Sequence, residues 1–282
     1  VGGAVIGSAA AFFLAEALPK GARVLVLEAD PSYAHCATTR SLASIRHQFS
    51  TPENVRMSMF GTEFLRLAGA RLEVDGVAPL IGFVEAGYLF LATQGGWPTL
   101  QRNHAVQRAE GAQVDLLAPA ALSQRFPWLA TSDLAGGSLG LAGEGWLDAH
   151  GLMHGFQRKA RSLGAQVRAA RVLRLRREGS RISAVQLADG SSIGCGTVIN
   201  AAGTGAAALA RSAGIDLPVQ ARKRCVFHFC SPEAAPGCPL VIDPSGLYFR
   251  PEGTGFLCGI APPEAEDPEC TDFDVPLDWF EE

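Results

Sequence analysis

The chain has 282 residues, of which 48% are hydrophobic and 18% charged, and its formal net charge is −4. A chain of this length buries a sizeable core as one large domain or two smaller ones, and its charge balance predicts no nucleic-acid partner. The seven cysteines include no C-x-x-C pair, so no metal site is expected. Apolar runs shorter than the roughly 20 residues of a membrane-spanning helix predict no membrane span.

The first residues, VGGAVIGSAAAFFLA, have the pattern of a turn that holds the phosphates of a dinucleotide. The glycines of such a turn, here Gly2, Gly3 and Gly7, allow a tight bend and close approach of the backbone to a pyrophosphate. Ala4 stands where the pattern has its middle glycine, and we expect its single methyl group to be tolerated. The alternative is a packed turn that binds no ligand.

An expected helix over residues 7–18 and an expected buried strand over residues 23–28, RVLVLE, follow this turn. Glu28 ends the strand about 20 residues after the glycines, where an acidic side chain meets a ribose hydroxyl in dinucleotide-binding folds. The order of turn, helix, strand and acid favours a nucleotide site over an isolated glycine turn.

The middle of the chain is predicted to mix helices and strands around a long polar loop that begins after Glu28. Helices are expected near residues 52–67, 101–110, 118–126 and 150–163, and a strand at 84–93. After residue 164 the pattern predicts strands that turn near 178–179 and 189–190. The arginines of this stretch are expected to form a solvated face.

The stretch TVINAAGTGAAALARSAG, residues 197–214, repeats the opening pattern of an apolar strand, a turn of small residues and a helix. From residue 218 onward we expect strands and turns. Together with the opening turn, this second turn indicates a cofactor longer than a mononucleotide. By itself it indicates only a tight strand–helix connection.

In chain order, the glycine turn, Glu28, SIRHQFSTPEN, VINAAG and GLYFRPEG resemble the FAD-dependent oxidoreductases of the D-amino-acid oxidase and sarcosine oxidase superfamily. A closer likeness, to one branch with bacterial and mitochondrial members, depends on HQFSTPENVRMSMF, FPWL, GEGWLDAHGLMHGFQRKARSLGA, LPVQARKR and PLVIDPSGLYFRPEG. The resemblance covers essentially the whole chain.

This resemblance implies an α/β fold, α+β overall, in which a Rossmann-like FAD-binding domain is interleaved with a mostly antiparallel substrate domain. The expected FAD-binding domain comprises residues 1–79 and 148–213, without its first strand. The expected substrate domain comprises residues 80–147 and 214–282. Because family members continue for roughly another hundred residues, we expect the chain to be truncated at both ends.

The resemblance also implies roles for individual residues. The pyrophosphate of FAD would bind the opening turn, and the adenosine ribose would bind Glu28. Arg46 would lie near the isoalloxazine ring, and Tyr248 would bind the substrate carboxylate. The positions implied for FAD are Gly2, Gly3, Ala4, Gly7, Glu28, Thr38, Thr39, Arg46, Val172, Ala202 and Gly203. A cation at Arg46 would stabilise the reduced, anionic flavin, whereas the alternative is a solvated loop arginine. No covalent attachment motif accompanies His35 and Cys36, so FAD is expected to bind non-covalently.

The implied activity is oxidation of a C–N bond in a small amine or (N-methyl) amino acid by hydride transfer to the flavin, with an unknown electron acceptor. Alternatives are a flavoprotein that serves mainly as a respiratory-complex assembly or interaction factor, a non-functional fragment, and a nicotinamide dehydrogenase. The bacterial members imply a cytoplasmic location, and the mitochondrial member implies a mitochondrial location as the alternative.

Overall fold

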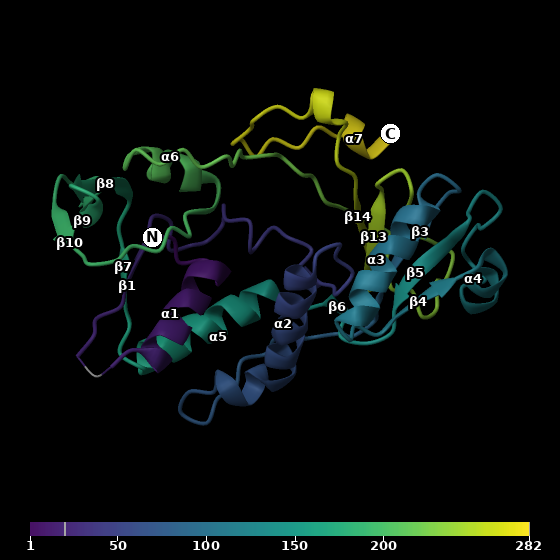
Figure 1. The fold of residues 1–282 in the computed structure, drawn as a ribbon, viewed down its shortest axis with the longest axis horizontal. Coiled ribbons are helices and arrows are strands. Elements are labelled where there is room, and N and C mark those ends of the chain that lie inside the picture. Colours follow the sequence, from purple (N-terminus) through teal and green to yellow (C-terminus); the bar gives the residue numbers. More distant parts are fainter. Residues whose placement is uncertain (20, 282) are drawn as a thin grey trace.

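The computed structural model describes residues 1–19 and 21–281, and these form mixed sheets with helices packed against them. In Figure 1, strands β7–β10 and the largest sheet lie at opposite ends of the long axis, with helices α1, α2 and α5 between and below them. The mixed α/β class predicted from the sequence is confirmed.

One end of the molecule is built around a short parallel strand pair and a three-stranded antiparallel sheet of order β10-β9-β8. The parallel pair is β1 (Leu25–Glu28) with β7 (Gln166–Ala169). The other elements here are α1 (Val5–Ala17), α2 (Pro52–Arg71), α5 (Ala149–Ser162), β8 (Val172–Glu178), β9 (Arg181–Leu187), β10 (Ser192–Gly194), a 3-10 turn (Gly203–Gly205) and α6 (Ala206–Arg211).

Helices α1, α2 and α5 share an aromatic core. Phe12 of α1 is fully buried, and Phe64 of α2 stacks on Phe156 of α5 with ring centroids 5.2 Å apart. Gly7 and Ala11 keep the buried face of α1 narrow, so that this helix packs closely on its neighbours. The turn before α1 is therefore held on a rigid layer of helices.

The other end is a seven-stranded sheet of order β11-β14-β13-β12-β3-β5-β4, in which all described pairs except β12 with β3 are antiparallel. Its strands are β3 (Tyr88–Ala92), β4 (Val114–Leu117), β5 (Gly136–Gly140), β11 (Phe227–Phe229), β12 (Leu240–Ile242), β13 (Tyr248–Glu252) and β14 (Gly255–Gly259). Helices α3 (Trp97–Ala109) and α4 (Pro119–Arg125) lie beside β4 and β5. The limits of the two expected domains remain a prediction.

A small ribbon lies between the two ends. Strand β2 (Ser44–Ile45) pairs with β6 (Gly145–Trp146), with Ser44 opposite Trp146. The ribbon fixes the end of the long polar loop beside the seven-stranded sheet. Two short elements, a 3-10 turn (Glu264–Glu266) and α7 (Asp278–Glu281), lie toward the chain end.

The strand predicted at residues 197–200 is not formed. This segment makes two backbone hydrogen bonds with Val1, which donates to the Ile199 carbonyl (2.8 Å) and accepts from the Ala201 amide (2.8 Å). A single residue gives no ladder, so the extended segment does not become a strand. The turn and helix predicted after it are present at residues 203–211.

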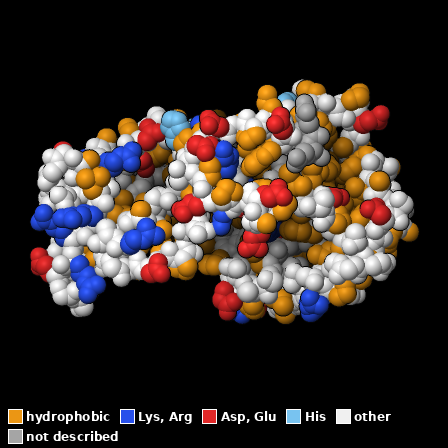
Figure 2. Space-filling model, turned by 90° about the horizontal axis from the view of Figure 1, so that it is seen from above, with side chains coloured by type: hydrophobic (Ala, Val, Ile, Leu, Met, Phe, Trp, Pro, Cys, Tyr) orange, Lys and Arg blue, Asp and Glu red, His pale blue; other side chains and the backbone are white. Residues whose placement is uncertain are grey.

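The predicted solvated arginine face is confirmed, since Arg168, Arg171, Arg174, Arg176, Arg177 and Arg181 are all exposed. Figure 2 shows Lys and Arg side chains gathered at the left end of the molecule, where β8–β10 lie. Within the described residues, the helices are all too short or too polar to cross a membrane.

Candidate FAD and substrate site

The opening turn is closed so tightly that side chains are excluded from it. Gly2 has φ +91°, and a Cβ there would lie 2.1 Å from the Ala201 carbonyl oxygen. A Cβ on Gly7 would lie 1.8 Å from the carbonyl oxygen of Gly2. The turn therefore requires glycine at both positions and lies directly against the second turn of small residues near Ala201.

Gly3 is the best-anchored residue of the turn. Its amide donates to Glu28 Oε2 (2.7 Å), and its carbonyl accepts from Ser8 Oγ (2.6 Å) and Gln157 Nε2 (3.0 Å). Both Ser8 and Gln157 are buried. The sequence did not single out Gln157, because an amide on a helix face gives no motif until α5 is seen to pack beside the turn.

Ala4 is the N-cap residue of α1 and has an extended backbone, with no hydrogen bond from its side chain to the helix. Thr38 lies at this helix end and accepts a hydrogen bond from the Val5 amide (3.2 Å). Free amides and the helix dipole at such an end attract anions. The structure thus brings the glycines, Ala4 and Thr38 to one place suited to a pyrophosphate.

Glu28 lies at the carboxyl end of β1, where its two oxygens accept from the Gly3 and Asp30 amides (both 2.7 Å). Each carboxylate oxygen has two lone pairs, so both can accept a further hydroxyl. Glycines that exclude a Cβ, an open helix end and this acid together fit the phosphates and ribose of a dinucleotide. In the FAD family this would be the adenosine half.

Val172, Ala202 and Gly203 lie on the other side of the turn. Val172 and Ala202 pack, with Val1, against the apolar cluster between α6 and the β8–β9 hairpin. Gly203 has φ +54° and opens the 3-10 turn. Val172 and Ala202 thus share one apolar cluster with Val1, the residue before the glycine turn, and Gly203 follows Ala202 in the chain.

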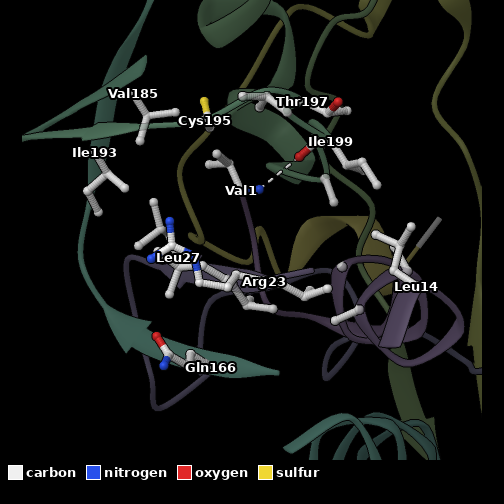
Figure 3. Close-up of a pocket in the computed structure, with 18 of the residues that line it drawn as sticks. Val1, Leu14, Arg23, Leu27, Gln166, Val185, Ile193, Cys195, Thr197 and Ile199 are labelled. Carbon is white, nitrogen blue, oxygen red and sulfur yellow. Dashed lines mark hydrogen bonds between the residues drawn. The ribbon is translucent and has the colours of Figure 1, made fainter. Parts of the chain in front are cut away.

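Figure 3 shows a groove of about 600 Å³ between β1, α1 and residues 193–201. Its wall is largely aliphatic, with Leu14, Leu27 and Ile193 among the labelled side chains, and the Val1–Ile199 hydrogen bond lies among the lining residues. Gly2 and Gly7 of the glycine turn also line this groove, so the turn borders a largely apolar wall.

Thr39 has a different environment from Thr38. Its hydroxyl donates to the Tyr33 carbonyl (2.7 Å) and so fixes the loop that begins after Glu28. Thr39 also lines a second, polar cavity of about 420 Å³, which extends to Arg250 on β13 and the first turn of α5. The loop therefore connects the nucleotide end of the site with the seven-stranded sheet.

Arg46 is half-buried among aromatic rings and is not a solvated loop residue. Its Cζ lies 4.8 Å from the ring centroid of Phe49, 5.5 Å from that of Phe90 and 5.9 Å from that of Tyr88. Among the described residues, its buried Nε has no hydrogen-bond partner. A cation that is partly shielded from water interacts more strongly with a nearby charge than a fully solvated one does.

The backbone beside Arg46 is held by a buried carboxyl group that the sequence did not reveal. Glu144 has no exposed surface, and its oxygens accept from the His47 amide (2.6 Å) and from Gln48 Nε2 (2.9 Å). Burial raises the pKa of Glu144 to about 7. Gln48 also accepts from Ser138 Oγ (2.7 Å), so this network ties the loop to β5.

Tyr248 lies at the start of β13, opposite Ile242 of β12, and Ile242 in turn lies opposite Phe90 of β3. Arg46 contacts the Phe90 ring from the loop after β2, so the two residues implied as catalytic are linked through Phe90 of β3 and Ile242 of β12. Burial raises the pKa of the Tyr248 phenol. This keeps the hydroxyl protonated, as a hydrogen-bond donor.

Arg250, two residues after Tyr248, is a further candidate. Only 5% of its surface is exposed, and its guanidinium lies 5.1 Å from the Trp146 ring centroid. In the sequence, Arg250 stands out only as a charged residue inside the apolar strand GLYFRPEG. The sequence alone could not tell whether this arginine is buried or exposed.

Comparison with known proteins identifies the family. The family DAO, described as FAD dependent oxidoreductase, matches residues 1–281. The FAD-dependent oxidoreductase domain-containing protein 1 of Xenopus laevis is 38% identical over 100% of this chain. The chain spans 64% of the length of that relative.

Solved structures agree in fold. L-proline dehydrogenase from P. horikoshii matches 99% of this chain and 72% of its own with TM-score 0.80 and 24% identity. Glycine oxidase from Geobacillus kaustophilus matches 93% of this chain and 69% of its own with TM-score 0.75 and 24% identity. The chain belongs to the DAO family of FAD-dependent oxidoreductases.

Proposed function

We propose that the protein binds FAD non-covalently and oxidises a C–N bond of a small amine or (N-methyl) amino acid. The observation that carries the proposal is the closed glycine turn, in which Gly3 bonds Glu28 while Thr38 meets the open end of α1. FAD would supply the acceptor for a hydride from the substrate carbon. The substrate would lose its nitrogen-bound proton and leave as an imine, which water hydrolyses.

The chain's own residues would orient the substrate and stabilise charge. Arg46, half-buried against Phe49 and Phe90, would favour negative charge that forms beside it. Tyr248 would donate its phenolic hydrogen to the substrate carboxylate. The fold neighbours that act on proline and glycine support a substrate that carries both an amine and a carboxylate.

Absorption and anaerobic reduction of the protein purified with FAD test this function. We expect a flavin spectrum, release of the flavin by acid precipitation, and bleaching by one or more members of a panel of N-methyl and ordinary amino acids. A flavin that stays attached to the precipitate contradicts non-covalent binding. A flavin that no panel member bleaches counts against the oxidation and favours an assembly or interaction role.

A further inference from the structure

Glu144 is a buried ionisable residue to which the proposed function gives no role. It has no exposed surface, and its neighbours leave room for it by being glycines. A Cβ on Gly140 would lie 1.8 Å from Glu144 Oε2, and a Cβ on Gly143 would lie 2.3 Å from the His47 ring. The chain is thus packed around a carboxyl group at this position. A buried carboxylate is costly unless its charge is compensated.

The hydrogen bonds to Glu144 orient the carboxyl group without cancelling its charge. Its Oε1 accepts from the His47 amide (2.6 Å) and its Oε2 from Gln48 Nε2 (2.9 Å), and both donors are neutral. Gln48 is fixed in turn, because it donates to the Tyr88 carbonyl (3.0 Å) and accepts from Ser138 Oγ (2.7 Å). A carboxyl group accepts such bonds in either protonation state. The geometry therefore holds Glu144 in place and leaves its charge free to change.

Arg46 is the cation that acts on this carboxyl group. Burial raises the pKa of Glu144 to about 7, and the positive charge of Arg46 is among the influences that oppose the rise. Both residues also act on Tyr88. Burial raises the pKa of the Tyr88 phenol, the charge of Arg46 lowers it, and the charge of Glu144 raises it. The three residues therefore form one electrostatic cluster beside the loop that follows β2.

The other titratable groups around Glu144 are neutral or paired with each other. His47 is buried, and burial lowers its pKa, which favours the neutral ring. Glu85 and Arg66 form a partly exposed ion pair (2.8 Å) whose charges compensate each other. Within the described residues, the charges of this cluster that lack an ion-pair partner are therefore those of Arg46 and Glu144.

We propose that Glu144 is a proton-accepting partner of Arg46: when negative charge forms beside Arg46, the Glu144 carboxylate takes up a proton from solvent. The new charge repels the carboxylate, and more strongly in a buried cluster than in water, so the neutral form becomes favoured. The substrate supplies two electrons as a hydride, and water supplies the separate proton that binds a carboxylate oxygen. Glu144 acts through Arg46, so it is a positioning residue. The proposal rests on the proposed function for the position of the flavin beside Arg46.

Proton uptake during reduction of the protein purified with FAD tests this coupling. The flavin is reduced at an electrode, without any amine, and the protons taken up are measured from about pH 5.5 to 9. For a tenfold gain in proton affinity from a pKa of about 7, Glu144 takes up about 0.5 proton at pH 7.5 and almost none at pH 5.5. Protonation of the reduced flavin itself increases towards low pH, so the two sources have opposite pH dependence.

The reduction potential and the infrared spectrum report the same proton. Each proton taken up with two electrons adds about 30 mV per pH unit to the slope of the potential. Near pH 7.5 the wild-type potential should therefore fall about 15 mV per pH unit more steeply than that of Glu144→Gln. On reduction, the wild-type infrared difference spectrum should gain the carbonyl stretch of a protonated carboxylic acid, and that of Glu144→Gln should not.

The matched control is Glu85→Gln. It removes a carboxylate that bonds the same loop, at the Gly143 amide (2.8 Å), but one that is partly exposed. Its proton uptake, slope and infrared band should match the wild type. Equal losses in Glu85→Gln and Glu144→Gln overturn the proposal, as does equal uptake at pH 7.5 in the wild type and Glu144→Gln. A wild type that gains no carboxylic-acid band also overturns it, and this measurement does not depend on whether Glu144→Gln folds.

The coupling and the oxidation can fail separately. Extra proton uptake at the electrode without bleaching by any amino acid leaves the coupling and removes the oxidation. Bleaching by an amino acid without the extra proton leaves the oxidation and removes the coupling. A protein that binds no flavin overturns both.

Discussion

The Glu144 carboxylate and the Gln48 side-chain amide form a hydrogen bond of 2.9 Å, both residues being buried between the loop that bears Arg46 and the seven-stranded sheet. The same carboxylate accepts from the His47 amide. A single acidic group therefore fixes the backbone on the carboxyl side of Arg46. Its protonation state is coupled to folding, because burial raises its pKa to about 7 from 4.5.

This coupling predicts a pH-dependent stability that Glu144→Gln removes. Between pH 4.5 and 7 the folded protein holds a proton that the unfolded chain has released. The stabilising contribution is fully present below the unfolded pKa and is lost as pH rises through the folded pKa, a change of about 3 kcal/mol. Urea unfolding from pH 4.5 to 8 should show the wild-type advantage over Glu144→Gln shrinking by roughly that amount.

His47 titrates in the same region with the opposite sign, since burial lowers its pKa and makes the folded state less stable on acidification. His47 is present in the wild type and in Glu144→Gln, so its contribution cancels when their free energies of unfolding are subtracted. Glu53→Gln, on the exposed face of α2, is the control and should run parallel to the wild type. Parallel curves for Glu144→Gln would instead show that Glu144 does not exchange its proton on unfolding.

The glycine turn gives a prediction about stability. Gly7→Ala places a Cβ 1.8 Å from a backbone oxygen, so the turn must open, at a cost of at least about 2 kcal/mol. FAD binding should weaken in the same protein. Gly69→Ala in α2 is the opposite case, because the added Cβ meets no atom within 4 Å beyond its chain neighbours and the backbone of its own helix, and alanine favours helix by about 0.5–1 kcal/mol. Thermal unfolding of the two variants checks both signs; equal effects contradict the turn geometry.

The glycine turn and its contact with Glu28 could be predicted from the sequence, whereas the buried Glu144 and Arg250 could not. Gly2, Gly7 and Glu28 work through local spacing, since a turn, a helix and a strand follow each other within one short stretch. Glu144 and Arg250 make contacts between segments about 100 and 200 residues apart, Glu144 with His47 and Arg250 with Leu42. Neither contact leaves a periodic signal.

The strand wrongly predicted at residues 197–200 also shows that a local sequence pattern does not determine long-range pairing. Its composition, TVIN, is that of a buried strand, but a strand also needs a paired neighbour. Its described backbone bonds reach only Val1. Local propensity therefore predicted the residues of the second turn correctly and the hydrogen bonding before it incorrectly.

Arg46 gives a prediction about the bound flavin. Arg46→Leu removes a cation that is half-buried among Phe49, Tyr88 and Phe90, and should lower the two-electron reduction potential by about 20–60 mV, where 30 mV corresponds to about 1.4 kcal/mol. Arg46→Lys keeps the charge and should recover at least half of the change. Spectroelectrochemical titration measures both. A potential that is the same in all three proteins places Arg46 away from the flavin.

Glu28 gives the sharpest test of the nucleotide end. Glu28→Gln replaces one acceptor oxygen by an amide group, which would face either the Gly3 or the Asp30 amide as a second donor. The lost charge-assisted hydrogen bonds amount to about 1.5–3 kcal/mol, so the Kd for FAD should rise about 10- to 100-fold. Glu264→Gln, on an exposed 3-10 turn, is the control and should leave this Kd unchanged.

Fluorescence titration with FAD and, separately, with FMN distinguishes two origins of the effect. If Glu28 meets the adenosine ribose, the loss is confined to FAD, because FMN lacks that ribose; an equal loss for both flavins means that Glu28 acts only by shaping the turn.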